Sequence, residues 1–209
     1  MSRPTKEQRL ANLHSEALSQ FDNVQTALRD ERLQCLQDRR FYSLAGAQWE
    51  GPLWDIYENK PKFEVNKIML AVIRVVNEYR NNRITTYFSP ANGTKDKISD
   101  VIEGLYRADE FDSQSQEARD NAFEEAVKGG FGAYRLTNEY EDEYDEDNDY
   151  QRIRFKPIFD ADNCVFFDLD AKRRDKSDAK YCYVLSGMTK EAYTEEWGET
   201  NFSTWPHNV

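Results

Sequence analysis

The chain is poor in the residues that build zinc sites and disulfide frameworks. Its 209 residues include 3 cysteines and 2 histidines. Cys35, Cys164 and Cys182 are an odd number and form no C-x-x-C pair, while His14 and His207 lie near opposite ends. A structural zinc site needs a set of closely spaced ligands, and a disulfide framework needs paired cysteines. We therefore expect free thiols, buried or half-buried, in a reducing cytosol, and predict no metal and no cofactor.

Long apolar runs and an excess of positive charge are also missing. The longest unbroken apolar run, Ile68 to Ile73, has six residues, whereas a membrane span needs about 20. The N-terminus has no apolar segment of a signal peptide, so no membrane association is expected. The net charge of -11 argues against a protein that coats nucleic acid, because phosphate binding needs a cationic face.

Core-forming side chains are present, and the acidic excess is local. The composition is 39% hydrophobic and 13% aromatic, which excludes a fully disordered chain and allows one sizeable core. Residues 139–149 hold eight acids and no base, so the rest of the chain carries -11 + 8 = -3. The sequence therefore predicts a nearly neutral body with one acidic insert.

The acidic insert has the alternating spacing of a calcium-binding loop but lacks its other requirements. Asp145, Asp147 and Asp149 alternate with other residues, as the ligands of an EF-hand do. Tyr150 stands in the place of the glycine that allows the sharp turn, and Lys156 in the place of the bidentate glutamate. An EF-hand is thus excluded, and we interpret the run as a solvated loop.

Apolar periodicity predicts a long first helix over residues 5–44. Within it Phe21, Leu28, Cys35 and Tyr42 recur every seven residues and form a narrow seam, with charges on the other faces. Such a seam packs either on the helix's own domain or on another chain, and the sequence leaves both open. We divide the chain into an N-terminal helical arm, residues 1–45, and an α+β domain, residues 46–209.

The second part predicts helices followed by strands, and hence an α+β fold with a helical core and an antiparallel hairpin. An aromatic loop over residues 46–61 carries Trp49, Trp54 and Tyr57, anchors for docking on the parent domain or on a neighbouring chain. The expected elements after it are a central core helix at 63–80, a strand at 84–88, helices at 95–106 and 115–129, hairpin arms at 131–140 and 151–159 with one apolar and one basic face, strands at 164–167 and 181–185 joined by a charged turn at 171–179, and a helix capped by Thr189 that runs to 197.

Few residues stand in a sequence pattern that is typical of a catalytic or ligand-binding site. Asp160, Asp170 and Lys172 match the acid…acid-x-lysine pattern of metal-dependent nucleases, which requires Asp170 and Lys172 on one face of a firm strand. They stand instead at the start of a charged run typical of an exposed turn. Residues 129–132 are glycine-rich but lack the Lys-Ser/Thr that cradles phosphate. We predict no catalytic, cofactor-binding or metal-binding residue, and keep the nuclease as an alternative beside a stand-alone acidic interaction protein that mimics DNA.

Several long segments resemble a known family. E-A-V-K-G-G-F-G-A-Y-R-L-T-N-E-Y-E-D and D-K-S-D-A-K-Y-C, followed by V-L-S-G-M-T, are similar to passages of portal proteins from short-tailed, Salmonella-phage-type bacteriophages. Earlier pieces fit in the same order: Phe21-Asp22, the stretch around Trp49 and Trp54, and N-N-R-I-T-T-Y-F-S-P. The resemblance covers residues 18–197.

The resemblance implies a structural role without catalysis. Portal proteins of this family are dodecameric rings at one vertex of the virion head, assembled in the host cytoplasm. Terminase packs double-stranded DNA through the ring, without sequence-specific binding, and scaffold, coat and tail adaptor proteins contact it. The matched region is similar to the wing, and the stem, clip and crown would lie beyond Val209. We therefore expect a truncated chain that by itself is a monomer or a weak oligomer.

Overall fold

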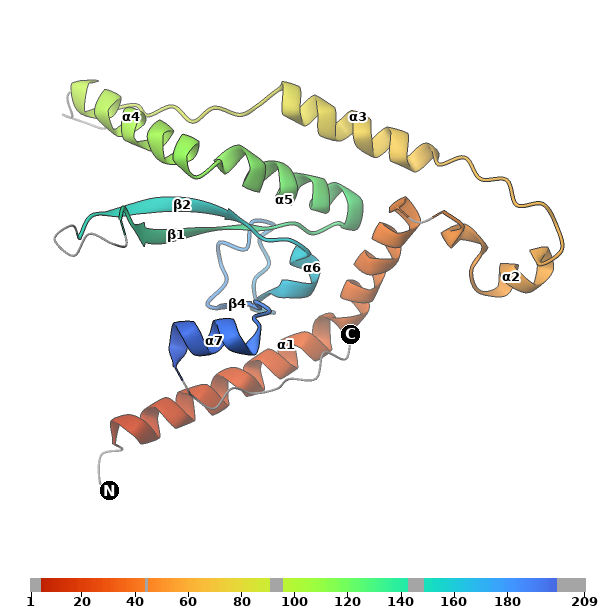
Figure 1. Ribbon diagram of the computed structural model, residues 1–209, viewed down its shortest axis with the longest axis horizontal. Coiled ribbons are helices and arrows are strands. Elements are labelled where there is room, and N and C mark those ends of the chain that lie inside the picture. The colour runs from red at the N-terminus through yellow and green to blue at the C-terminus, as the bar shows by residue number, and fades with distance from the viewer. Residues whose placement is uncertain (1–4, 44, 91–95, 143–148, 199–209) are drawn as a thin grey trace.

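The computed structural model describes residues 5–43, 45–90, 96–142 and 149–198. The fold is α+β, with a two-stranded hairpin lying between α3, α4 and α5 on one side and the long helix α1 on the other (Figure 1). The elements in chain order are α1 (Lys6–Ser43), the short 3-10 helix η1 (Ala47–Trp49), α2 (Pro52–Tyr57), α3 (Lys67–Asn81), α4 (Asp96–Asp112), α5 (Ser115–Gly129), β1 (Tyr134–Tyr140), β2 (Gln151–Pro157), α6 (Ala161–Cys164), β3 (Val165–Phe167), β4 (Cys182–Val184) and α7 (Lys190–Trp197). No helix in these residues is long and apolar enough to cross a membrane.

The helix α1 confirms the first predicted helix and shows what its seam contacts. Phe21 and Val24 are buried, and the Phe21 ring meets the Phe166 ring edge-on with centroids 5.1 Å apart. Leu28 packs against the same cluster. The seam therefore packs on its own domain, because the small sheet of β3 and β4 brings Phe166 beneath it.

The helix α5 and the hairpin are joined by a short glycine-rich turn. Gly130 adopts a left-handed conformation (φ 84°), and its N–H donates to Ala126 O at 2.9 Å, which ends α5 as predicted. A Cβ built at Gly132 would lie 1.9 Å from the carbonyl oxygen of Ala122. Only glycine therefore lets the chain enter β1 so close to α5.

The predicted hairpin is present, but its apolar face is shorter than expected. The strands β1 and β2 pair antiparallel, with Leu136 opposite Phe155 and Asn138 opposite Ile153. Phe155 is buried beneath the helices, with the Tyr106 ring 6.4 Å away, whereas Ile153 is 47% exposed. The alternation predicted a continuous apolar face, which is wrong at Ile153 because that residue lies nearer the tip of the hairpin.

The helix α3 is not the central core helix that its apolar stripe predicted. It begins at Lys67 and not at residue 63, because the side chain of Asn66 caps it by accepting a hydrogen bond from Met69 N at 2.8 Å. Among its residues Val72 and Val76 are buried, while Leu70 is 68% exposed. The reason is that α3 contacts α5 and α1 on one side only.

The predicted strand at 84–88 is absent. Residues 83–90 run without helix or strand assignment, because no strand within the described residues pairs with them. The Phe88 ring instead meets the Tyr106 ring edge-on at 5.4 Å, and Thr86 Oγ1 lies 3.4 Å from Tyr106 OH. Side-chain contacts with α4 thus replace the ladder of hydrogen bonds that a strand would need.

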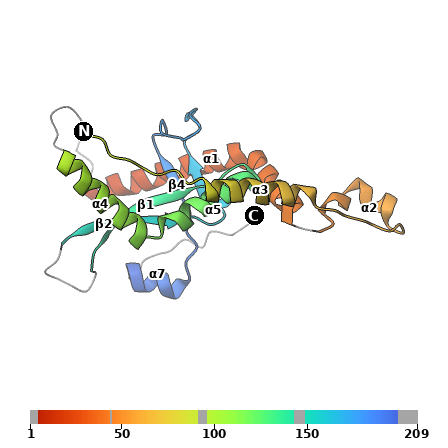
Figure 2. The same ribbon diagram turned by 90° about the horizontal axis from the view of Figure 1, so that it is seen from above.

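The predicted aromatic loop contains two short helices, η1 and α2. The rings of Trp49 and Tyr57 are in tilted contact with centroids 4.9 Å apart, and Lys62 Nζ lies 3.8 Å from the centroid of Trp54, which is 53% exposed. Figures 1 and 2 both show α2 projecting away from the other elements. These ring contacts of the loop's aromatic residues are thus local ones, within residues 46–62.

The C-terminal elements follow the prediction with small shifts. Cys164 ends α6 and is not part of β3, and Thr189 caps α7 by accepting a hydrogen bond from Ala192 N at 3.2 Å. All three cysteines are free, but Cys182 is exposed, contrary to the expectation that the thiols are buried or half-buried. The predicted loop residues 143–148 and the C-terminal residues 201–209 lie outside the described residues.

Two glycines give a matched test of the fold. Gly132→Ala should lower the free energy of unfolding by about 1–3 kcal/mol, since its methyl group overlaps the Ala122 carbonyl. Gly104→Ala, in the interior of α4 where a Cβ meets nothing within 4 Å, should raise it by up to about 1 kcal/mol. Urea denaturation followed by circular dichroism measures both. Equal stability of the two variants would show that the approach of β1 to α5 is looser than described.

Candidate functional site

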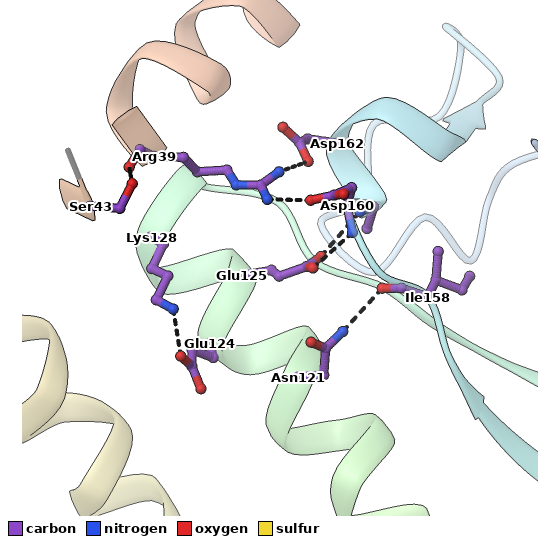
Figure 3. Close-up of polar contacts among 10 residues, drawn as sticks. Arg39, Ser43, Asn121, Glu124, Glu125, Lys128, Ile158, Asp160 and Asp162 are labelled. Atoms are coloured by element: carbon purple, nitrogen blue, oxygen red, sulfur yellow. Dashed lines mark hydrogen bonds and ion pairs between the residues drawn. The ribbon is translucent and has the colours of Figure 1, made fainter. Parts of the chain in front are cut away.

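The most connected polar cluster lies where α1, α5 and α6 meet (Figure 3). Arg39 of α1 donates from Nη1 to Asp162 Oδ1 at 2.6 Å, and its Nη2 forms an ion pair with Asp160. Glu125 of α5 accepts hydrogen bonds from the backbone N–H groups of Asp160 and Ala161, at 2.9 and 3.1 Å. One guanidinium and one carboxylate thus fix the start of α6 against two other helices.

The geometry explains why Asp160 needs this support. Asp160 has φ 53°, in the left-handed region that is unfavourable for most residues other than glycine. Asp162 is buried, and a buried carboxylate is costly unless it is paired. Hydrogen bonding to Asp160, together with the nearby charge of Asp162, raises the pKa of Arg39. The cluster is therefore a structural ion network that stabilises the turn into α6.

A second arginine of α1 anchors the small sheet. Arg32 donates from Nη2 to Val165 O at 2.6 Å, and its guanidinium lies between the rings of Phe131 and Phe166, 4.6 and 5.1 Å from their centroids. Burial lowers the pKa of Arg32. Contacts of a cation with two aromatic faces compensate part of this cost. Arg32 therefore ties α1 to β3 and to the glycine-rich turn together.

The thiols near the cluster are not activated. Burial raises the pKa of Cys35 and of Cys164, and nearby carboxylates raise both further. A nucleophilic cysteine instead needs a lowered pKa, because the thiolate is the reactive form. Neither residue therefore has the chemistry of a catalytic nucleophile.

The three residues of the nuclease alternative do not come together as that chemistry requires. Asp160 is engaged by Arg39, and Asp170 Oδ2 lies 4.0 Å from Lys180 Nζ. The strand β3 ends at Phe167, so Asp170 and Lys172 stand in the following turn, where Lys172 N donates to an Asp178 carboxylate at 2.8 Å. No group of three or more potential metal ligands occurs in the part of the chain that the structure describes. The requirement for one firm strand face is not met.

A further ion network holds the segment after α3 on α5. Arg83 donates from both terminal nitrogens to the two carboxylate oxygens of Asp120, at 2.9 Å each, and this raises the pKa of Arg83. Arg80 pairs with Glu124 at 3.0 Å. An open cleft of about 730 Å³ lies beside these pairs, lined by Tyr79 among others. The three arginines that line the cleft are engaged within the chain: Arg119 pairs with Glu110, Arg83 with Asp120 and Arg107 with Glu103.

Sequence reasoning missed the partners in these networks. Arg39 is separated from Asp160 and Asp162 by 121 and 123 residues, and Arg32 from Val165 by 133. The charges of α1 are spread over its surface, so no periodic pattern singles out the two arginines that turn inward. The one signal in the sequence that could have indicated these two arginines is their position in α1. Each lies within one helical turn of the seam residue Cys35, on the side that faces the domain.

A pair of arginine variants tests the network at α6. Arg39→Met should lower the free energy of unfolding by about 3 kcal/mol, because buried Asp162 loses its partner. Arg40→Met is the control, since the Arg40–Glu50 pair is about half exposed and should contribute less than about 1 kcal/mol. Chemical denaturation measures both. If Arg39→Met/Asp162→Asn were no more stable than Arg39→Met alone, the unpaired charge would not be the cause.

The fold and its polar clusters define a structural α+β module, in which the inward-facing charges join elements. The family described as phage P22-like portal protein matches residues 18–207, and the chain belongs to this family. It is 37% identical over 197 residues to the portal protein of Acyrthosiphon pisum secondary endosymbiont phage 1. The match covers 91% of this chain and 27% of that protein, so the chain spans about a quarter of the length of this relative.

Proposed function

We propose that the chain is part of a subunit of a bacteriophage portal, the ring at one vertex of the head through which DNA is packaged and ejected. The observation that carries the proposal is the family match over residues 18–207, together with a relative that is itself a portal protein. In this role twelve subunits form the head-to-tail connector in the virion. Terminase, scaffold, coat and tail adaptor proteins contact the ring, and DNA passes through it.

The distribution of apolar surface supports a subunit of a larger assembly. In the part of the chain that the structure describes, few side chains larger than alanine are fully buried. The apolar ones are Val24 and Val165. Large apolar residues remain exposed along α1, α3 and α4, with Leu13 and Leu70 at 63% and 68%. Extended apolar surface on a folded protein marks a site of association. Ring contacts and the rest of a portal subunit would cover such faces.

The paired charges on the hairpin support a protein that does not grip DNA. Arg152 of β2 contacts Glu141 at 2.6 Å and Asp109 at 3.6 Å, and Lys156 forms an ion pair with Glu139. Two of the three cations on the face of β2 that the sequence predicts to be basic, Arg152 and Lys156, are thus paired with carboxylates. Since DNA affinity comes from unpaired cations that replace counterions on the phosphates, this face offers little attraction.

Three finer assignments belong to the same proposal. The chain corresponds to the wing of the portal, it divides into an arm of residues 1–45 and a domain of residues 46–209, and it performs no catalysis. The long α1 followed by an α+β body is compatible with this division. The alternative of a DNA mimic would act through the acidic run, of which residues 143–148 lie outside the described residues, and no observation favours it.

Ring formation and packaging test the proposal. The protein expressed from its complete gene should form rings with a central channel in electron micrographs. Deleting the gene from the phage should leave heads without packaged DNA, and supplying it from a plasmid should restore packaging. A protein that forms no ring, in a phage that packages normally without the gene, would contradict the proposal.

Plasmid cleavage separates the proposal from the nuclease alternative. The purified chain incubated with supercoiled plasmid and Mg²⁺ should leave the plasmid intact, because Asp170 and Lys172 lie in a turn after β3. Lys172→Ala is the matched control for a contaminating nuclease. Cleavage by the natural chain that disappears in Lys172→Ala would establish the alternative.

A further inference from the structure

The helix α4 turns a polar side toward its own domain and an apolar side away from it. Ser99 is buried, and Tyr106 and Glu110 meet Arg119 of α5, with Arg119 Nη2 2.8 Å from Tyr106 OH and 2.5 Å from Glu110 Oε1. A surface helix ordinarily buries its apolar stripe and exposes its polar one. The outward stripe, which we call the α4 outer face, holds four large apolar residues with these exposed fractions: Ile98 50%, Val101 62%, Ile102 45% and Leu105 59%.

Gly104 belongs to the same outer face. It follows Val101 by three residues, which places the two side by side on the helix, and it directly precedes Leu105 in the chain. A Cβ at Gly104 would meet no atom within 4 Å, so no contact inside the chain requires glycine there. Glycine in a helix interior is unfavourable compared with alanine, and it is typical of places where another backbone approaches closely. Ala108 follows one turn later and keeps that part of the face shallow. The face is thus shaped for a second helix lying across it.

The N-terminal turns of α1 carry a matching uncovered stripe. Leu10 and Leu13, 56% and 63% exposed, continue the stripe that is buried further along the helix at Phe21 and Val24. The seam is therefore covered by its own domain in its middle part and uncovered at its beginning.

The charges beside the two stripes are complementary. Lys6 and Arg9 flank Leu10 and Leu13, and neither forms an ion pair with any residue that the structure describes. Of the acidic residues of α4, Glu103, Asp109, Glu110 and Asp112 are paired with arginines of the same chain. Asp100 of α4, next to Val101, is exposed and has no ion pair within the described residues. Opposite charges at the edges of two apolar faces favour their association and orient it.

The two faces lie on different sides of the molecule. Figure 1 shows α4 above the hairpin and the N-terminal half of α1 below it. The two stripes of one chain thus belong to helices on opposite sides of the hairpin. A contact that joins different surfaces of identical chains is head-to-tail, which is the type that generates a ring when the rotation closes.

We propose that the α4 outer face binds the N-terminal turns of α1 from a second copy of the same chain. The proposal rests on the ring function proposed above and names the surfaces that make one of its subunit contacts. In it Leu10 and Leu13 of one copy pack across Val101, Gly104 and Leu105 of the next. Lys6 and Arg9 lie beside Asp100 of α4.

Paired cysteine variants test the contact in the protein expressed from its complete gene. The background is Cys182→Ser, because Cys182 is the exposed thiol, whereas Cys35 and Cys164 are half-buried. Leu13→Cys and Leu105→Cys are made separately and treated with a short bifunctional maleimide. Their mixture should give cross-linked dimers, each alone should give none, and the double variant should give a ladder of higher oligomers.

The outcomes separate the possible occupants of the face. Dimers from Leu105→Cys alone would show a two-fold contact of α4 with itself and overturn the proposal. A mixture that stays uncross-linked although electron micrographs show rings would overturn the proposal and leave the portal function intact. Absence of rings in the natural protein as well would instead contradict the proposed function. The background variant alone reports any reaction of Cys35 and Cys164.

A bulky residue at Gly104 gives an independent readout. Gly104→Trp should reduce the cross-linked yield from the mixture about tenfold, which corresponds to a loss of about 1.4 kcal/mol in association. Its fold should be retained, because a Cβ at this position meets nothing within 4 Å, and circular dichroism of the variant checks this. Gln37→Trp, at an exposed position of α1 remote from Leu13, is the matched control and should leave the yield unchanged. A normal yield with Gly104→Trp would contradict close approach at this glycine.

Discussion

The pairing of Arg39 with Asp160 and Asp162 is the interaction on which the arrangement of the chain depends. It joins the end of the first helix to a turn more than a hundred residues later, beside the point where Glu125 of α5 holds the same turn. With α6 fixed there, β3 lies under α1 and brings Phe166 against Phe21. A buried carboxylate without a partner is costly, so loss of Arg39 would weaken the contact between all three segments.

A second constraint is the closeness of α5 to the hairpin. Gly132 removes the one Cβ that would collide with the Ala122 carbonyl, and Phe155 then lies beneath Tyr106 and Arg119. Helices and hairpin are thereby joined over a small area, and the apolar core is correspondingly small. Outside that area α3 and α4 keep apolar side chains at the surface, which a free-standing domain of this size has little reason to do.

The ring function proposed above offers a physical explanation for this surface. A ring subunit buries part of its apolar surface against neighbours, so its own core need not account for every large side chain. The same view explains the polar clusters. Arg39, Arg32 and Arg83 are each bound to groups of the same chain, and these contacts fix the positions of the helices.

Much of the fold could be predicted from the sequence, because helices and hairpins depend on neighbours close in the chain. The periodicity of α1, the Gly129-Gly130 stop after α5, the two hairpin arms and the Thr189 cap of α7 are all local signals, and the structure confirms them. The strand at 84–88 was predicted wrongly for the complementary reason. A strand exists only if another strand supplies its hydrogen bonds, and local propensity cannot report whether one is near.

The sequence by itself thus determined most of the helices, the hairpin, the acidic run and the family resemblance. The tertiary structure decided which faces those elements cover. Periodicity shows that α4 is amphipathic, but only packing shows that its polar side faces inward and its apolar side outward. Likewise the seam of α1 is apolar along its whole length, and only the position of β3 separates the covered Phe21 from the uncovered Leu13. Burial depends on partners distant in the chain, and these partners are brought together by long-range contacts such as those of Arg39.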